Sequence, residues 1–488
     1  MSTSTFTREQ RQRYREKVQL CLDVFESMLG TETFEGERPL TGLEVELNLV
    51  DAAFQPALKN FEVLDEIADP AFQTEIGAYN IEMNVPPRLL TGDTALGLEA
   101  EMRASLNAAE AAANRREAHI VMVGILPTLM PQHVETANWM SPSARYAALN
   151  DSIFAARGED IHLDIAGVER VSMYAATLAP ESACTSVQLH LQLAPKNFAR
   201  AWNAAQLLAG PQVALGANSP YFYGRELWRE TRTELFLQAT DTRPPELRNQ
   251  GVRPRVWFGE RWITSIFDLF EENVRYFPSL LPELSDEDPV AVFEAGKAPR
   301  LQELGLHNGT IYRWNRPIYE TVDGRPHVRV ENRVLPAGPT VVDIVANAAF
   351  YYGGLRVLME EDRPAWTKMT FQTAQENFTE CARLGLDATV YWPGLGEVSV
   401  EELVLRRLLP MAAEGLQRWG ASGPVVDRYL GIIEQRAKTG RNGASWQVET
   451  VRRLEARGAD RVQALTQMLR LYVQGMHSNQ PVHGWPLP

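Results

Sequence analysis

Cysteine, long apolar runs and glycine-rich phosphate loops are scarce or absent in this sequence. Its 488 residues include three cysteines, Cys21, Cys184 and Cys381, which lie far apart and show neither metal-binding nor redox spacing. This usage predicts a reducing compartment and no disulfide framework. The N-terminal residues are polar and then charged, and no run of eighteen apolar residues occurs. We therefore expect a cytoplasmic protein without a membrane partner.

Positive charge is also in deficit. The chain has 48 lysines and arginines against 62 aspartates and glutamates, a formal net charge of −14. This balance argues against a nucleic-acid backbone as the main partner, although a local basic pocket for phosphates remains compatible with it. No Walker-type or Rossmann glycine motif occurs, so a nucleotide site would have to be built on another structural element.

The rest of the composition is that of an ordinary globular protein, with 45% hydrophobic and 23% charged residues. The length would allow two or three domains. However, there is no internal repeat or low-complexity linker, and candidate strands are scattered among candidate helices. This pattern favours one α+β body with a helical C-terminal part, and we expect a division into residues 1–360 and 361–488, with the second section packed on the same body.

One short stretch, residues 41–50, carries the strongest pattern. Apolar residues at positions 43, 45, 47 and 49 alternate with Glu44, Glu46 and Asn48, which is the period of a half-buried strand. Both carboxylates then stand on one sheet face, where they repel each other unless a cation lies between them. A hard divalent cation such as Mg²⁺ prefers oxygen ligands of this kind. The alternative is a solvent-facing strand with ordinary surface glutamates.

A second strand is expected over residues 76–85, ended by Pro86 and Pro87, with Asn80, Glu82 and Asn84 on one face. A polar amide and carboxylate stripe again stands opposite an apolar one. The pattern of the first strand is therefore repeated.

Two further strands complete the set. Residues 187–193 place Gln188 and His190 on a polar face. Residues 310–317 and 327–334 predict a hairpin around Asp323-Gly324, and its second strand aligns Arg329, Glu331 and Arg333 on one face. Outside these strands we expect helices over 7–29, 94–118, 195–209 and 225–239, strands over 120–126 and 161–165, a mobile segment over 240–305, mostly helix from 341, and an extended tail over 477–488.

Each of these strands alone is weak evidence, but together they predict a concave sheet face lined by carboxylates, one histidine and arginines. Such a face can bind a metal–nucleotide and stabilise a transferring phosphoryl group. The carboxylates would hold two or three Mg²⁺ ions that bridge the phosphates of a nucleotide. Permanently charged guanidinium groups would neutralise the phosphoryl oxygens, and the candidates are Arg313, Arg316, Arg329 and Arg333. The alternatives are surface ion pairs for the arginines and glutamates, and a hydrogen-bonded structural role for the histidine.

In order along the chain, the stretches Gly-Leu-Glu-Val-Glu, Tyr-Asn-Ile-Glu-Met-Asn, Cys-Thr-Ser-Val-Gln-Leu-His-Leu and Val-Glu-Asn-Arg-Val resemble glutamate-cysteine ligase family 2, the carboxylate-amine ligases. Residues 217–220 and the segment around Arg232 are similar to the middle section of that family. The resemblance covers roughly residues 40–360. It implies a glutamine-synthetase-like fold in which a curved antiparallel sheet, flanked by helices, forms the catalytic funnel. It also implies the use of ATP and Mg²⁺ to phosphorylate a carboxylate, which an amine then converts to an amide.

The resemblance also implies roles for single residues. Metal ligation falls to Glu44, Glu46, Glu82, His190 and Glu331. Arg333 is similar to the family arginine that contacts phosphate, and Arg232 to one near the substrate or nucleotide. Family members commonly have His-x-His where this chain has Gln188-Leu189-His190. A glutamine offers only a neutral carbonyl oxygen to a cofactor, so this departure bears on the substrates more than on the chemistry.

We therefore expect an ATP-dependent carboxylate-amine ligase with small-molecule substrates, for which glutamate and cysteine are the pair that the family suggests. Nothing in the sequence selects cysteine as the amine, and the chain could form a homo-oligomer. One alternative is a guanidino-type kinase, which stops at phosphoryl transfer. Another is a non-catalytic nucleotide-binding or regulatory protein on the same fold.

Overall fold

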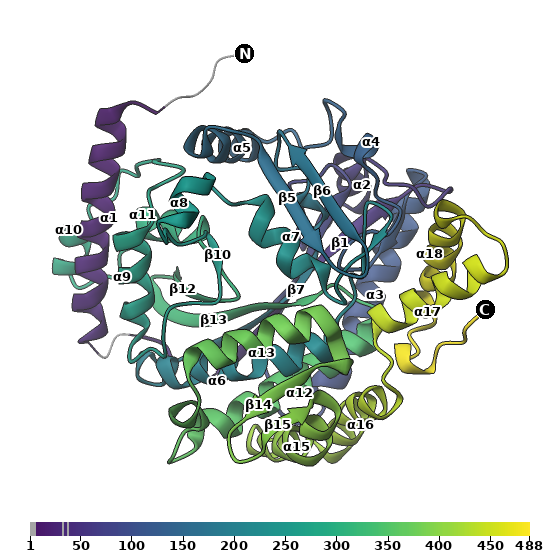
Figure 1. Cartoon of the computed structure of the whole chain (residues 1–488). Coiled ribbons are helices and arrows are strands. Elements are labelled where there is room, and N and C mark those ends of the chain that lie inside the picture. The colour runs from purple at the N-terminus through teal and green to yellow at the C-terminus, as the bar shows by residue number, and fades with distance from the viewer. Residues whose placement is uncertain (1–5, 32–33, 37–38) are drawn as a thin grey trace.

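The computed structural model describes residues 6–31, 34–36 and 39–488. Its centre is one antiparallel sheet of seven strands (Figure 1). In spatial order these are β12 (Asn315–Val322), β13 (Arg325–Pro336), β7 (Ser186–Leu193), β1 (Leu40–Val50), β3 (Asn80–Leu89) and β2 (Phe72–Thr74), with β4 (His119–Val121) paired to the end of β1. The four strands that the sequence singles out are therefore direct neighbours in the sheet.

Four two-stranded sheets surround it. They are β5 (Ile161–Ala166) with β6 (Arg170–Ala175), β8 (Tyr221–Phe222) with β9 (Arg225–Glu226), β10 (Val256–Trp257) with β11 (Tyr312–Arg313), and β14 (Thr389–Trp392) with β15 (Gly396–Ser399).

Helices make up most of the remaining described chain. The α-helices are α1 (Arg8–Leu29), α2 (Asn60–Ile67), α3 (Thr94–Arg115), α4 (Pro131–Val134), α5 (Ala144–Arg157), α6 (Pro195–Gly216), α7 (Thr231–Ala239), α8 (Pro245–Asn249), α9 (Ile266–Tyr276), α10 (Pro289–Glu294), α11 (Gln302–Gly309), α12 (Val341–Glu360), α13 (Phe371–Leu384), α14 (Val400–Leu403), α15 (Leu409–Arg418), α16 (Gly423–Thr439), α17 (Gly443–Ala456) and α18 (Arg461–Ser478). Short helical turns are η1 (Glu181–Ala183), η2 (Ala365–Lys368), η3 (Gly385–Asp387), η4 (Val404–Leu408) and η5 (Val482–Gly484).

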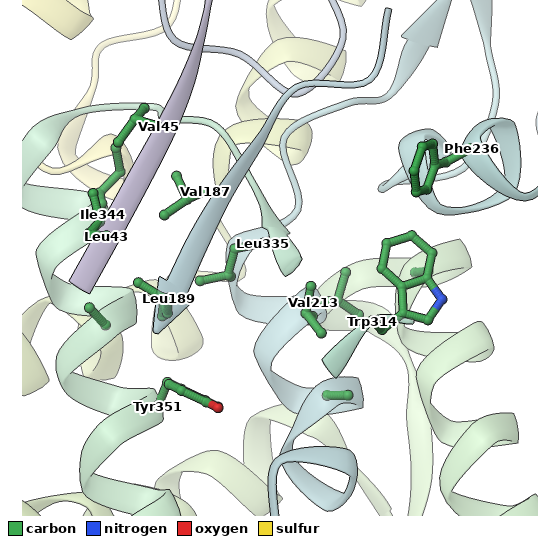
Figure 2. Close-up of a cluster of buried hydrophobic side chains, with 14 of the residues drawn as sticks. Leu43, Val45, Val187, Leu189, Val213, Phe236, Trp314, Leu335, Ile344 and Tyr351 are labelled. Atoms are coloured by element: carbon green, nitrogen blue, oxygen red, sulfur yellow. The ribbon is translucent and has the colours of Figure 1, made fainter. Parts of the chain in front are cut away.

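The apolar face of the sheet packs on helices. Figure 2 shows Val45 of β1 and Leu189 of β7 in the same buried cluster as Ile344 and Tyr351 of α12 and Val213 of α6. Since side chains alternate along a strand, the polar residues of β1 and β7 point to the opposite face. One side of the sheet is thus core, and the other is free to form a site.

Two of the expected strand boundaries need comment. The hairpin is confirmed, and its turn residues Asp323 and Gly324 have the positive φ values of 50° and 76° that this turn requires. Its first strand is β12, Asn315–Val322, however, and not residues 310–317, because residues 312–313 pair with β10 as β11. The second strand, however, does not stop at Pro86. It continues to Leu89, because its register with β1 shifts opposite Gly42, and the bulge tolerates residues without an amide hydrogen.

Three other expectations were wrong in part. The segment 240–305 contains α8 to α10 and the start of α11, and α9 begins with a capping box formed by Ser265 and Asp268. The helix expected from residue 225 begins at Thr231, because residues 225–226 pair as β9. The tail is not simply extended, since α18 reaches Ser478 and the ring of Trp485 packs against two aromatic side chains.

Helix α12 is long and apolar enough to cross a membrane, but 89% of its most apolar window is buried inside the protein. It packs closely on α15 at two glycines. A Cβ atom built on Gly415 would lie 1.8 Å from the carbonyl oxygen of Gly353. The helices can approach this closely only because neither residue has a side chain.

We expect Gly415→Ala to lower the free energy of unfolding by at least ~2 kcal/mol, because the added methyl group meets backbone that cannot move independently. Gly431→Ala on α16, where a Cβ atom meets open space, should instead raise it by about 0.5–1 kcal/mol through helix propensity. Urea unfolding of both variants measures the difference. Equal free energies for the two variants would contradict the close helix contact.

Candidate active site

The polar face of the sheet forms the floor of a cavity of about 430 Å³. Strands β1, β3, β7, β12 and β13 provide its floor, and η1, α5, α7 and the end of α11 provide its rim. Among the lining residues are all the predicted site residues except His190. The cavity is lined by Glu44, Glu46, Glu75, Ile76, Asn80, Glu82, Arg145, Tyr146, Leu149, Glu181, Ser182, Cys184, Thr185, Ser186, Gln188, Arg232, Phe236, Leu281, Gly309, Thr310, Tyr312, Arg313, Trp314, Arg316, Ile318, Arg329, Glu331 and Arg333.

Strand register explains why the acidic groups meet. Glu46 of β1 stands directly opposite Glu82 of β3, and His190 of β7 opposite Glu331 of β13. Directly opposed residues in an antiparallel pair have Cβ atoms only about 4.5–5.5 Å apart. The predicted ligands from separate strands are therefore held together by the sheet itself.

The acidic groups form two clusters. In the first, Glu44, His190 and Glu331 each offer a ligand atom, and these atoms lie within 4.8 Å of one another. We call this the histidine cluster. In the second, Glu46 and Glu82 are joined in the same way by Glu75, and we call this the glutamate cluster. Three ligand atoms from separate chain segments converge in each, and the donor set of carboxylate oxygens and one imidazole suits a hard divalent cation.

Burial and mutual repulsion perturb the glutamate cluster. Burial, together with the charges of Glu44 and Glu46, raises the pKa of Glu82 to about 7. Burial and the neighbouring carboxylates raise the pKa of Glu75 well above its ordinary value. Burial also raises the pKa of Glu46, although Arg333 acts in the opposite direction. Carboxyl groups that resist ionisation in this way are common at functional sites.

The histidine cluster is compensated by arginines. Burial alone would raise the pKa of Glu331, but the guanidinium groups of Arg316 and Arg333 outweigh it and hold that pKa well below its ordinary range. Arg316 donates to both carboxylate oxygens of Glu331, at 2.6 and 3.0 Å. The Nε2 atom of His190 lies 3.1 Å from Glu44 Oε1, and its Nδ1 atom accepts from Arg329 Nε at 3.1 Å.

Gln188 connects the two clusters. Its amide nitrogen donates to Glu46 Oε1 at 3.0 Å, and its carbonyl oxygen accepts from Arg333 Nη1 at 2.7 Å. Arg333 also lies 3.2 Å from Glu331. The carbonyl oxygen that could have served as a cofactor ligand is therefore engaged by the arginine, and the glutamine bridges an anion and a cation.

Two predicted arginines line the cavity while their guanidinium groups bind buried partners. Arg232 donates to Glu230 at 2.9 Å and to backbone carbonyl oxygens of β13. Arg313 donates to Glu272 at 3.0 Å and stacks on Trp257, with 4.6 Å from its central carbon to the ring centroid. Burial lowers the pKa of Arg313 to about 10. These contacts indicate that Arg232 and Arg313 have a structural role in the wall of the cavity.

Sequence reasoning missed two acidic residues of the cavity. Glu75 follows the three-residue strand β2, and Glu181 lies in the turn η1 just before β7. Burial and the charge of Glu46 raise the pKa of Glu181 to about 8. Neither residue lies in an alternating stretch, so no periodic signal marked it. Their only signal was an acidic side chain next to an expected polar strand.

The sheet and the clustered site define a class, the carboxylate-amine ligases with a glutamine-synthetase-like fold. The model of glutamate-cysteine ligase family 2 matches residues 40–465. The chain belongs to this family and is an enzyme of the carboxylate-amine ligase class. The match continues past residue 360, so the division at that position stays a prediction.

Solved structures agree in fold. Glutamate–cysteine ligase from Francisella tularensis, solved in complex with AMP, aligns with a TM-score of 0.54 and 13% identity over 91% of this chain and 90% of that chain. A bifunctional glutathione synthetase from Pasteurella multocida aligns with a TM-score of 0.52 and 14% identity over 96% of this chain and 55% of that chain. No curated protein matches the sequence.

The raised pKa values predict an unusual pH dependence of stability in metal-free protein. Because Glu82 has a folded-state pKa of about 7 against an ordinary 4.5, its contribution is present below about pH 4.5 and is lost as the pH rises through 7. Glu82→Gln should therefore gain stability relative to wild type between pH 5 and 8, by up to ~3 kcal/mol. Urea unfolding in a chelator at several pH values measures this difference, and parallel curves would contradict it.

Proposed function

We propose that the protein is an ATP-dependent ligase that phosphorylates the γ-carboxylate of glutamate and joins the resulting acyl group to an amine, with cysteine as the amine that the family suggests. The observation that carries the proposal is the convergence of the two acidic clusters on one sheet face with three arginines of β12 and β13, namely Arg316, Arg329 and Arg333. Phosphoryl transfer needs positioning and charge stabilisation more than covalent chemistry from the protein, and this cavity has the groups for both.

The two clusters would hold Mg²⁺. Glu46, Glu75 and Glu82 offer oxygen atoms only, whereas the histidine cluster adds one imidazole nitrogen. Such ions supply charge neutralisation at phosphoryl oxygens. In the neutral imidazole of His190, the Nδ1 atom that accepts from Arg329 leaves the proton on Nε2. Ligation through Nε2 would therefore require Arg329 to release the ring.

The arginines would act on the transferring group. Arg333 lies between the clusters, hydrogen-bonded to Gln188 and Glu331, and its planar fork suits the oxygens of a phosphoryl group. Arg316 would keep Glu331 ionised and oriented. Arg232 and Arg313 would contribute by holding β13 and β11 in place, because their guanidinium groups are bound to buried partners.

The proposal also accounts for the departure at Gln188. As a bridge between Glu46 and Arg333, the glutamine holds the anion and the cation beside each other, with 4.0 Å between Arg333 Nη2 and Glu46 Oε1. Both groups still line the cavity, where a ligand would contact them. The substitution is thus compatible with turnover, which weakens the reading of a non-catalytic binding protein.

The direct test is phosphate release from ATP with Mg²⁺, glutamate and a panel of primary amines that includes cysteine. We expect amine-dependent release that Arg333→Lys lowers by at least about a hundredfold, because a point charge does not replace two directed donors. Arg325→Lys is the matched control, since Arg325 lies on the same strand with a 72% exposed side chain. Release without any amine requirement would favour the kinase alternative.

Metal binding gives a test that is independent of turnover. Mg²⁺ should raise the unfolding temperature of the wild-type protein, since a ligand that binds only the folded state stabilises it. Glu75→Gln should raise the half-saturating Mg²⁺ concentration by at least about tenfold. The control Glu101→Gln changes a 65% exposed carboxylate and should have no effect. Equal Mg²⁺ responses in both variants would remove Glu75 from the metal site.

A further inference from the structure

One acidic side chain of the cavity belongs to neither cluster. Glu181 lies in η1 and lines the cavity, and its Oε2 atom is buried without a hydrogen-bond partner in the described part of the chain. Within the same ranges no lysine, arginine or histidine lies within 4.0 Å of its carboxylate as an ion pair. A buried carboxylate without a partner is unfavourable unless a ligand compensates it.

Three arginines of the same cavity are engaged elsewhere. Arg333 binds Glu331 and Gln188, Arg316 binds Glu331, and Arg232 binds Glu230. Glu181 therefore lines the cavity and forms no ion pair with any of these three arginines. A positively charged group in the cavity would favour the ionised form of this carboxyl group and would find its counter-ion here.

We propose that Glu181 binds the ammonium group of the acceptor amine and so determines specificity for a cationic acceptor. The bound ammonium group would release one proton to water before its nitrogen attacks the acyl carbon, and phosphate would leave as the carbon–oxygen bond breaks. This inference rests on the proposed ligase function. Phe236 and Tyr312 line the same cavity, and their rings would contact the hydrocarbon part of the acceptor. Apart from Glu75, the two acidic clusters lie on the strands, as do Arg316, Arg329 and Arg333. The acceptor would therefore approach from the side of η1 while phosphate is held over the sheet.

Hydroxylamine separates this role from the general chemistry, because it is an uncharged amine near pH 7.5 and needs no counter-ion. In Glu181→Gln we expect the KM for the most active panel amine to rise about tenfold to a hundredfold, the effect of losing a hydrogen bond to a charged group. Formation of glutamyl hydroxamate from hydroxylamine should stay within about twofold of wild type, and the KM for glutamate and the Mg²⁺ requirement should not change.

Two further variants serve as controls. Glu181→Asp keeps the charge and should keep the KM for the amine closer to that of wild type. Glu117→Gln, which changes an 89% exposed carboxylate, should have no effect. The unfolding temperature of Glu181→Gln should equal or exceed that of wild type, because no partner in the described chain is lost.

Three results would overturn the assignment. An equal loss of hydroxamate and amide formation would place Glu181 in phosphoryl transfer, and an altered Mg²⁺ requirement would place it in the metal site. A lower unfolding temperature with an unchanged KM for the amine would make its role structural. A wild-type protein that forms no hydroxamate at all would instead overturn the ligase function itself.

Discussion

The repulsion among carboxylates on one face of a sheet is the constraint on which the rest of this structure depends. Glu46 and Glu82 stand opposite each other on the neighbouring strands β1 and β3, and Glu75 joins them from a loop. Like charges in this arrangement destabilise a sheet. The opposite face offsets this cost, because apolar side chains of the same strands are buried against α6 and α12 (Figure 2).

The arginines of the cavity are distributed unevenly between the two acidic clusters. Arg316 and Arg333 both bind Glu331, whereas Glu46 of the glutamate cluster has the more distant Arg333 and hydrogen bonds from Ser186 and Gln188. Carboxyl groups without a bound cation therefore remain where a divalent cation would bind, and at Glu181, where an ammonium group would bind. The proposed function, an ATP-dependent joining of a carboxylate to an amine, would use both kinds of cation.

Much of the fold and of the site could be predicted from periodicity. Alternation over β1, β7 and β13 identified Glu44, Glu46, His190, Glu331 and Arg333, because a period of two forces these side chains onto one face. The same reasoning failed where no period exists. Glu75 and Glu181 lie in a loop and a turn, and the buried partners of Arg232 and Arg313 come from segments that the sequence pattern could not place beside them.

By itself, the sequence determined which residues share a strand face, since that depends only on neighbours along the chain, and the motifs it carries determined the family. The tertiary structure alone decided which strands lie side by side, which carboxylates form a cluster and which partner each arginine binds. These properties depend on register and on contacts such as that of Gln188 with Arg333, 145 positions apart in the chain. Local patterns contain no information about contacts at that separation.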